Sequence, residues 1–149
     1  MVEILIADYD TDLYSICCRT MSPTLQALKK KQSQHFPQIA EELETHQRKI
    51  GHWAWWVFPT NRPGRSEPYP KTCVQPNERA LLLQGESAED WKKILCIIAD
   101  LMQKTQSWHD VLPSIDHGRL RFFIRYWKPE SAHTPWLKSV LQIFKEYQD

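Results

Sequence analysis

The chain has 149 residues, the size of one ordinary domain, and it is long enough to bury roughly 70% of its unfolded surface. Lysine and arginine number 19 and aspartate and glutamate 18, so the bulk charge is that of neither a basic nucleic-acid binder nor an acidic tail. Any charged site must therefore be local. We predict a single globular domain over residues 1–149.

The cysteines and the N-terminal sequence both favour a cytoplasmic protein. The four cysteines form no Cys-x-x-Cys pair, and the adjacent Cys17 and Cys18 suit neither a disulfide framework nor a zinc site. The first eight residues carry acids where a signal peptide needs basic residues, and their apolar stretch is too short to span a bilayer. We expect reduced thiols and no membrane segment.

The N-terminal part contains one well-marked helix start. Residues 1–21 suit a short strand or an opening helix equally, and the pattern does not decide between them. Ser22-Pro23 begins a helix, because serine can cap it and proline fits its first position. The cations Lys29–Lys31 suit the C-terminal dipole of that helix.

A second helix is predicted to begin at Pro37. Its apolar residues recur at intervals of three and four as far as Val57, which is the helical period. Gly51 predicts a kink or a break just before His52, at a cost of about 1 kcal/mol relative to alanine. Pro59 ends the element.

A proline-rich loop is predicted over about residues 59–76. Five prolines and Gly64 exclude a long regular element there. Long irregular connections inside domains are usually functional or disordered, and Tyr69 favours packing over disorder, so the loop is a candidate wall of a site.

The C-terminal half is predicted to be helical. Asn77 caps a short helix that Gly85 ends, and Ser87 opens an amphipathic helix. The stretch 118–127 can form a strand or a helix, and we favour the helix in a helical protein. Thr134-Pro135 begins the last helix. The predicted fold class is all-α, a compact helical bundle.

The aromatic run His52–Pro59 permits two interpretations. On a helix it would be apolar on nearly every side, which is typical of a segment buried all round. Under the first interpretation it is a core helix, and a backbone carbonyl satisfies His52. Under the second, His52 and the rings of Trp53, Trp55 and Trp56 line a cavity, where an indole stacks on a planar ligand.

Two polar turns add charged groups that can complete such a cavity. Arg62, Gly64 and Arg65 lie in the proline-rich loop, where an arginine fork can bind a phosphate through two hydrogen bonds. Asp116-His117-Gly118-Arg119 forms the second turn, followed by Arg121. Taken separately, these turns fit a solvated loop and an aspartate that caps the next helix.

Common catalytic and metal-binding signatures are absent from the sequence. It contains no GxGxxG, GxxxxGK[ST], HExxH or GxSxG motif. The six histidines form no ligand-spaced pair with a cysteine or a carboxylate. We therefore predict neither a metal nor a cofactor.

Residues Arg48–Pro59, followed by Gly64-Arg65-Ser66, resemble the pattern of a small uncharacterised bacterial family that is sometimes labelled calpastatin-like. In that family a basic pair precedes His-Trp-x-Trp and a Phe-Pro ending, and a Gly-x-Ser element follows. The resemblance covers residues 38–83 and implies an all-α fold. It also implies that His52, Trp53, Trp55 and Arg65 belong to one shared feature, and it implies no settled activity.

Three functions follow as hypotheses. The first is a pocket protein that binds, and in one version hydrolyses or transfers, a nucleotide or ADP-ribose-like phosphorylated ligand. In it, His52 or Asp116 is the general acid or base, and the ligand contacts are Trp53, Trp55, Trp56, Arg65, His117, Arg119 and Arg121. The second is a non-catalytic protein-interaction module that uses the loop and Lys29–Lys31. The third, nucleic-acid binding through Arg119–Arg125, is disfavoured by the balanced charge.

Overall fold

A computed structural model describes residues 21–62 and 73–149 of the chain. Over these residues the fold is all-α, as predicted, with a single parallel bridge between Thr60 and Cys73 as its only β-type pairing. The elements in chain order are α2 (Pro23–His46), α3 (Ala54–Val57), η1 (Pro76–Glu78), α4 (Arg79–Leu82), α5 (Glu86–Thr105), η2 (Ser114–Asp116), α6 (His117–Ser131) and α7 (Pro135–Glu146). No helix in the described ranges is both long and apolar enough to cross a membrane.

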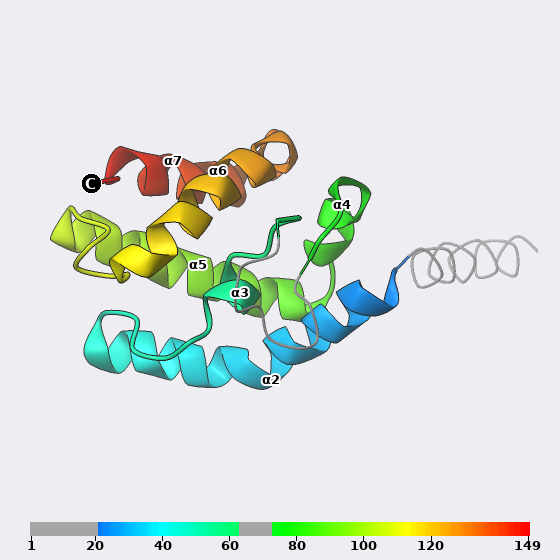
Figure 1. Ribbon diagram of the computed structural model, residues 1–149, viewed down its shortest axis with the longest axis horizontal. Coiled ribbons are helices and arrows are strands. Elements are labelled where there is room, and N and C mark those ends of the chain that lie inside the picture. The colour runs from blue at the N-terminus through cyan, green and yellow to red at the C-terminus, as the bar shows by residue number, and fades with distance from the viewer. Residues whose placement is uncertain (1–20, 63–72) are drawn as a thin grey trace, which may run out of the picture.

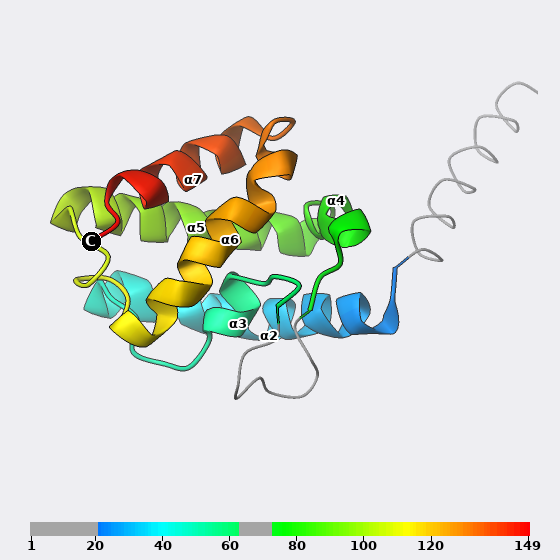
Figure 2. The ribbon, with the colours of Figure 1, turned by 45° about the horizontal axis from the view of Figure 1, so that its top comes forward.

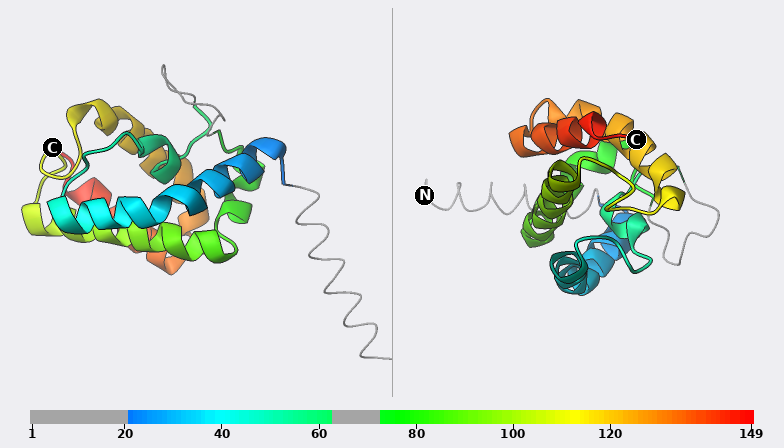
Figure 3. Two further views of the ribbon diagram at one scale, coloured as in Figure 1. Left: turned by 90° about the horizontal axis from the view of Figure 1, so that it is seen from below. Right: turned by 90° about the vertical axis from the view of Figure 1, so that its left-hand side faces the viewer.

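Helix α5 lies in the middle of the molecule, with α2 on one side and the α6–α7 hairpin on the other (Figures 1 and 3). Its apolar stripe is buried because it meets both neighbours, and Trp91, near the N-terminal end of the helix, has no exposed surface. The Trp91 ring contacts Trp127 edge-on, with 5.0 Å between ring centroids. Burying side chains of this size contributes about 1.5–3 kcal/mol each, so this aromatic contact joins α5 firmly to α6.

Several local signals act as the sequence predicts. The Ser22 hydroxyl accepts a hydrogen bond from the Leu25 N–H at 3.1 Å and so caps α2. Thr134 is the N-cap residue of α7, and Pro135 is its first residue. The stretch 118–127 is helical, because α6 buries Leu120, Phe123 and Trp127 against the core.

The prediction of a new helix at Pro37 is wrong, since α2 continues through that residue to His46. Pro37 lies on the exposed side of the helix, while Phe36 and Ile39 beside it are buried. Their packing offsets the hydrogen bond that a proline removes from a helix. Lys29–Lys31 therefore lie in the N-terminal half of α2 and not at its C-terminus.

Helix α2 ends where Gln47 adopts the left-handed conformation, with φ of 56°. The predicted helix through the aromatic run is consequently also wrong, because only the single turn of α3 forms there. The chain between α2 and α3 crosses the end of the molecule as a loop (Figure 2). The centre of the predicted proline-rich loop lies outside the described residues.

Candidate functional site: a basic groove between α6 and α7

The aromatic run takes its position from a carboxylate on α2. Glu42 accepts hydrogen bonds from the Ile50 N–H at 2.9 Å, from the Gly51 N–H at 3.1 Å and from the Trp53 indole N–H at 2.6 Å. Burial alone raises the pKa of Glu42, but these hydrogen bonds and the charge of Lys49 lower it overall below its ordinary value. The carboxylate is therefore ionised at neutral pH and holds the 47–53 loop against α2.

The tryptophans of the run differ in their surroundings. Trp53 is buried, and its indole N–H bonds to Glu42. Trp55 and Trp56 are half-buried, and the Trp56 ring stacks on His35 with centroids 4.5 Å apart. His52 is exposed.

The last carbonyls of α3 and the two that follow it find partners on three other helices. A one-turn helix leaves its last carbonyls without intrahelical donors. Here side chains supply the donors, each at 2.8–2.9 Å: Gln32 to Trp56, Trp91 to Val57, Arg119 to Phe58 and Trp127 to Pro59. The run is thus tied to α2, α5 and α6, and Arg119 serves this structural role.

Asp116 and His117 also have partners within the fold. The Lys49 ammonium lies 2.9 Å from the Asp116 carboxylate, and both side chains are nearly buried. The same ammonium lies 5.4 Å from the centre of the Trp53 ring, which is within cation–π range. The buried His117 ring nitrogen Nε2 lies 3.0 Å from the Leu112 carbonyl oxygen. Lys49 thus brings Asp116 and Trp53 together, as part of the packing.

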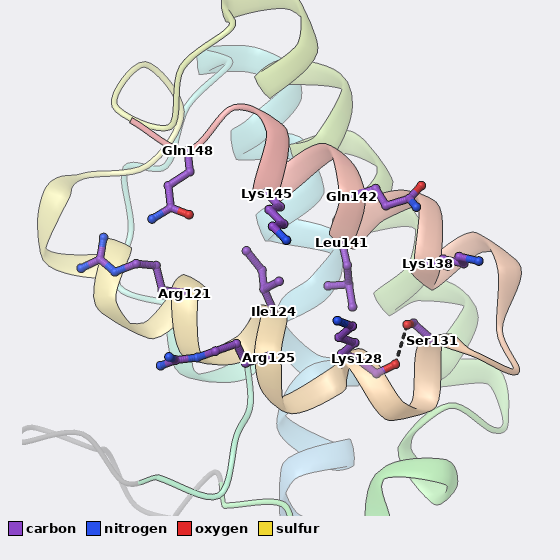
Figure 4. A pocket seen from close by; sticks show the side chains of 10 residues that line it. All are labelled: Arg121, Ile124, Arg125, Lys128, Ser131, Lys138, Leu141, Gln142, Lys145 and Gln148. Carbon is purple, nitrogen blue, oxygen red and sulfur yellow. Dashed lines mark hydrogen bonds between the residues drawn. The ribbon is translucent and has the colours of Figure 1, made fainter.

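Arg65 and Arg121 are the two predicted ligand-binding arginines to which no structural role has been assigned above. Arg65 lies outside the described residues. Arg121 is exposed on α6 and lines a groove between α6 and α7 (Figure 4). No other predicted site residue of the described ranges lines this groove.

The groove between α6 and α7 has a volume of about 600 Å³. Helix α6 contributes Arg121, Ile124, Arg125, Lys128 and Ser131, and α7 with the residues after it contributes Lys138, Leu141, Gln142, Lys145 and Gln148. Figure 4 shows Ile124 and Leu141 between the helices, with Lys128 pointing from α6 toward α7 and Lys145 from α7 toward α6. Charged ends thus surround an apolar floor.

The electrostatics of the groove are one-sided. All five cations that line it are exposed, and among the described lining residues there is no carboxylate. None of the five makes an ion pair within residues 21–62 and 73–149, where the ion pairs are Lys49–Asp116 and Arg79–Glu130. Because the whole chain has a net charge of +1, the groove is a local concentration of positive charge. Such a surface attracts anions.

The family model described as Protein of unknown function (DUF1810) matches residues 22–149. The chain belongs to this family. The match covers both the aromatic run and the groove, and it confirms the expectation of an uncharacterised family. No curated protein and no solved structure matches the chain.

In this DUF1810 chain, sequence reasoning missed most of the groove. Arg121, Arg125 and Lys128 lie four and three residues apart, so they share one face of α6, opposite the buried Leu120, Phe123 and Trp127. Lys138 and Lys145 lie seven residues apart and likewise share a face of α7. This spacing could have predicted a basic face on each of the two helices. That the two faces meet is fixed only by the short turn over residues 132–134.

Proposed function

We propose that the chain binds a phosphorylated small molecule of nucleotide size in the basic groove between α6 and α7. The observation that carries the proposal is the set of five exposed cations around the floor of Ile124 and Leu141, none of which forms an ion pair with another described residue. The ligand class is the one predicted from the sequence. The proposed location is different, because the Trp53 indole and the carbonyls of residues 56–59 make hydrogen bonds within the fold.

Size and chemistry support this ligand class. Ligand pockets usually measure about 300–1,000 Å³, and this groove lies within that range. Arginine binds phosphate through two parallel hydrogen bonds and lysine binds it as a point charge, so both residue types suit phosphate oxygens. The floor formed by Ile124 and Leu141 suits the less polar part of such a molecule, a sugar or a base.

A binding role is proposed in preference to a catalytic one. The described lining residues include no histidine, cysteine or carboxylate that could move a proton in this groove. The Ser131 hydroxyl donates a hydrogen bond to the Lys128 carbonyl at 2.6 Å (Figure 4), so it is held by its own helix. The resemblance to the calpastatin-like pattern is retained in this proposal, and its described part, residues 48–59, is assigned a role in the fold.

A thermal-shift and calorimetry series tests the proposal. ADP-ribose, NAD, ATP and ribose 5-phosphate are compared with adenosine, which lacks phosphate. We expect stabilisation by the phosphorylated compounds, and we expect Arg125→Gln/Lys145→Gln to weaken their binding. Lys30→Gln/Lys93→Gln is the matched control, because it removes the same charge from exposed positions on α2 and α5. Absence of binding at millimolar ligand, with a folded chain, overturns the proposal.

A protein-interaction module is the second candidate, and one observation favours it. Ile115 and Ile50 are 85% and 51% exposed, and their neighbours Asp116 and Lys49 form an ion pair, so both isoleucines lie at one end of the molecule. Exposed apolar residues that cluster can mark an interface. Self-association that Ile50→Ser/Ile115→Ser abolishes, in a chain that binds no phosphate, would favour this candidate.

A further inference from the structure

Two arginine side chains lie beside the Phe122 ring on α6. The guanidinium carbon of Arg62, which follows α3 in the chain, is 4.1 Å from the ring centroid, and that of Arg125 is 5.9 Å from it. Both distances are within cation–π range. Because they share one ring, the two guanidinium carbons are at most about 10 Å apart, which is about the Debye length at 0.1 M ionic strength. The two positive charges therefore act jointly on an anion near them.

Arg62 is held at this place by its backbone as well as by the ring. Its N–H donates a hydrogen bond to the Thr60 hydroxyl at 3.1 Å, and that hydroxyl donates one to the Arg62 carbonyl at 3.3 Å. Thr60 is buried, and its own carbonyl accepts a hydrogen bond from the Val74 N–H at 2.9 Å. A guanidinium that lies over an aromatic face keeps its N–H donors at its edge. Arg62 is thus pre-organised, and it forms no ion pair with another described residue.

Arg125 connects this pair of arginines to the groove. It lines the groove between α6 and α7, and Arg121, which lies one turn earlier on α6, lines it too. Residues four apart are neighbours on a helix surface, and Figure 4 shows these two arginines extending to the same side. At about 3.6 residues per turn, Arg125 falls between Arg121 and Phe122 around the helix. Arg121, Arg125 and Arg62 therefore form a row at one edge of the groove, and all three are exposed.

The row of arginines suits more than one phosphate group. Each guanidinium can bind a phosphate through two parallel hydrogen bonds. A single phosphate ester carries roughly 1.5–2 negative charges at neutral pH, which is fewer than the three positive charges of the row. Arg121 and Arg125 belong to the lining of the groove and can bind a first phosphate. Arg62 lies beyond Arg125 and can bind a second, adjacent phosphate.

We infer that the ligand of the groove carries a diphosphate, two adjacent phosphate groups, and that Arg62 binds the second of them. The less polar part of the ligand then lies over Ile124 and Leu141. Phe122 is a positioning residue, because it contacts the guanidinium of Arg62 and not the ligand. The inference rests on the proposed function, adds Arg62 to its site and specifies its ligand class.

Calorimetric titration of the full chain with AMP, ADP and inorganic pyrophosphate, at one ionic strength, tests the inference. A hydrogen bond to a charged group is strong enough to change affinity about tenfold, so we expect ADP to bind about tenfold or more tightly than AMP. Arg62→Gln should remove most of this difference by weakening ADP, while AMP keeps its affinity. Arg48→Gln is the matched control, because Arg48 is exposed on the 47–53 loop and does not line the groove. It should leave the ratio of the two affinities unchanged.

Two further variants separate ligand binding from a structural role of Arg62. Phe122→Leu keeps every charge but removes the ring beneath Arg62, so it should lower the affinity for ADP and not that for AMP. Arg62→Lys should recover only part of the ADP affinity, because lysine is a point charge without the planar fork. If Arg62 only attaches its segment to α6, Arg62→Gln and Phe122→Leu lower the Tm and leave the ratio of ADP to AMP affinity unchanged, and the inference is wrong.

The failures of the two proposals are distinguishable. If AMP binds the native chain as tightly as ADP, or if Arg62→Gln weakens both alike, the diphosphate ligand is wrong and phosphate binding in the groove stands. If no probe binds to a folded chain, the proposed function falls as well. Tighter binding of ADP than of pyrophosphate would identify a nucleotide-like source of the diphosphate, and equal binding would identify free pyrophosphate. Circular dichroism of each variant checks that it is folded.

Discussion

Replacement of Glu42 with alanine should destabilise the chain although Glu42 lies on the margin of the core. The substitution removes three hydrogen-bond acceptor contacts, to Ile50, Gly51 and the indole of Trp53. The two backbone groups can bond to water instead, whereas Trp53 is only 4% exposed and its N–H would lose its partner. An unsatisfied buried donor costs about 1–3 kcal/mol. The 47–53 loop also loses its attachment to α2, so we expect the free energy of unfolding to fall by about 2–3 kcal/mol in total.

Thermal and urea unfolding of Glu42→Ala beside Glu44→Ala measures this effect. Glu44 is exposed on the same helix, so its removal controls for charge and helix propensity. For a chain of this length, 2–3 kcal/mol corresponds to a fall in Tm of about 4–12 °C. A loss below about 0.5 kcal/mol, within the range of ordinary surface substitutions, would refute the role assigned to the carboxylate.

Three further predictions follow from the same contacts. The native chain should have a higher free energy of unfolding than Glu42→Gln in urea titrations, and this difference should shrink as the pH falls below 4.5. The pKa of Glu42 is lower in the folded chain than its ordinary value, so the ionised carboxylate stabilises the fold above that value and this stability is lost as the carboxylate protonates. A difference that stays constant with pH would contradict this. Arg119→Ala should lower the free energy of unfolding by about 1–3 kcal/mol, since the Phe58 carbonyl loses its donor, and a purely ligand-binding arginine would leave unfolding unchanged. Trp91→Phe should cost a similar amount in thermal unfolding, because it removes the donor to the Val57 carbonyl and opens space in the core; unaltered stability would argue against that contact.

The sequence predicted those parts of the fold that local pattern determines. The apolar stripe of α5, the serine cap of α2 and the Thr134-Pro135 start of α7 each depend on residues within a few turns of one another. These three local features form where the pattern predicts them.

The parts that failed depend on distant partners. Pro37 breaks a helix in isolation, and only the packing of Phe36 and Ile39 against other elements carries α2 through it. The aromatic run has helical spacing, yet donors 24 to 68 residues away satisfy its carbonyls without a long helix. The hydrophobic periodicity of a short sequence segment shows neither its tertiary packing nor its distant hydrogen-bond donors.

The candidate site was predictable only in part for the same reason. Arg121 was identified as a phosphate-binding residue from its place beside a polar turn. Lys138 and Lys145 become its neighbours only once the turn over residues 132–134 folds α7 back along α6. Asp116 was predicted as a capping or catalytic group, and its actual partner Lys49 lies 67 positions earlier in the chain.

Mapping where a phosphorylated ligand contacts the chain is the most direct test of the proposed groove. Backbone amide shifts of the isotope-labelled protein are followed by NMR during titration with ADP-ribose. We predict that the largest changes fall within residues 121–131 and 138–148, the two ranges that contain the residues lining the groove, and that Arg125→Gln/Lys145→Gln reduces them. Changes centred on His52, Trp53 and Trp56, or no changes at millimolar ligand, would contradict the assignment of the groove.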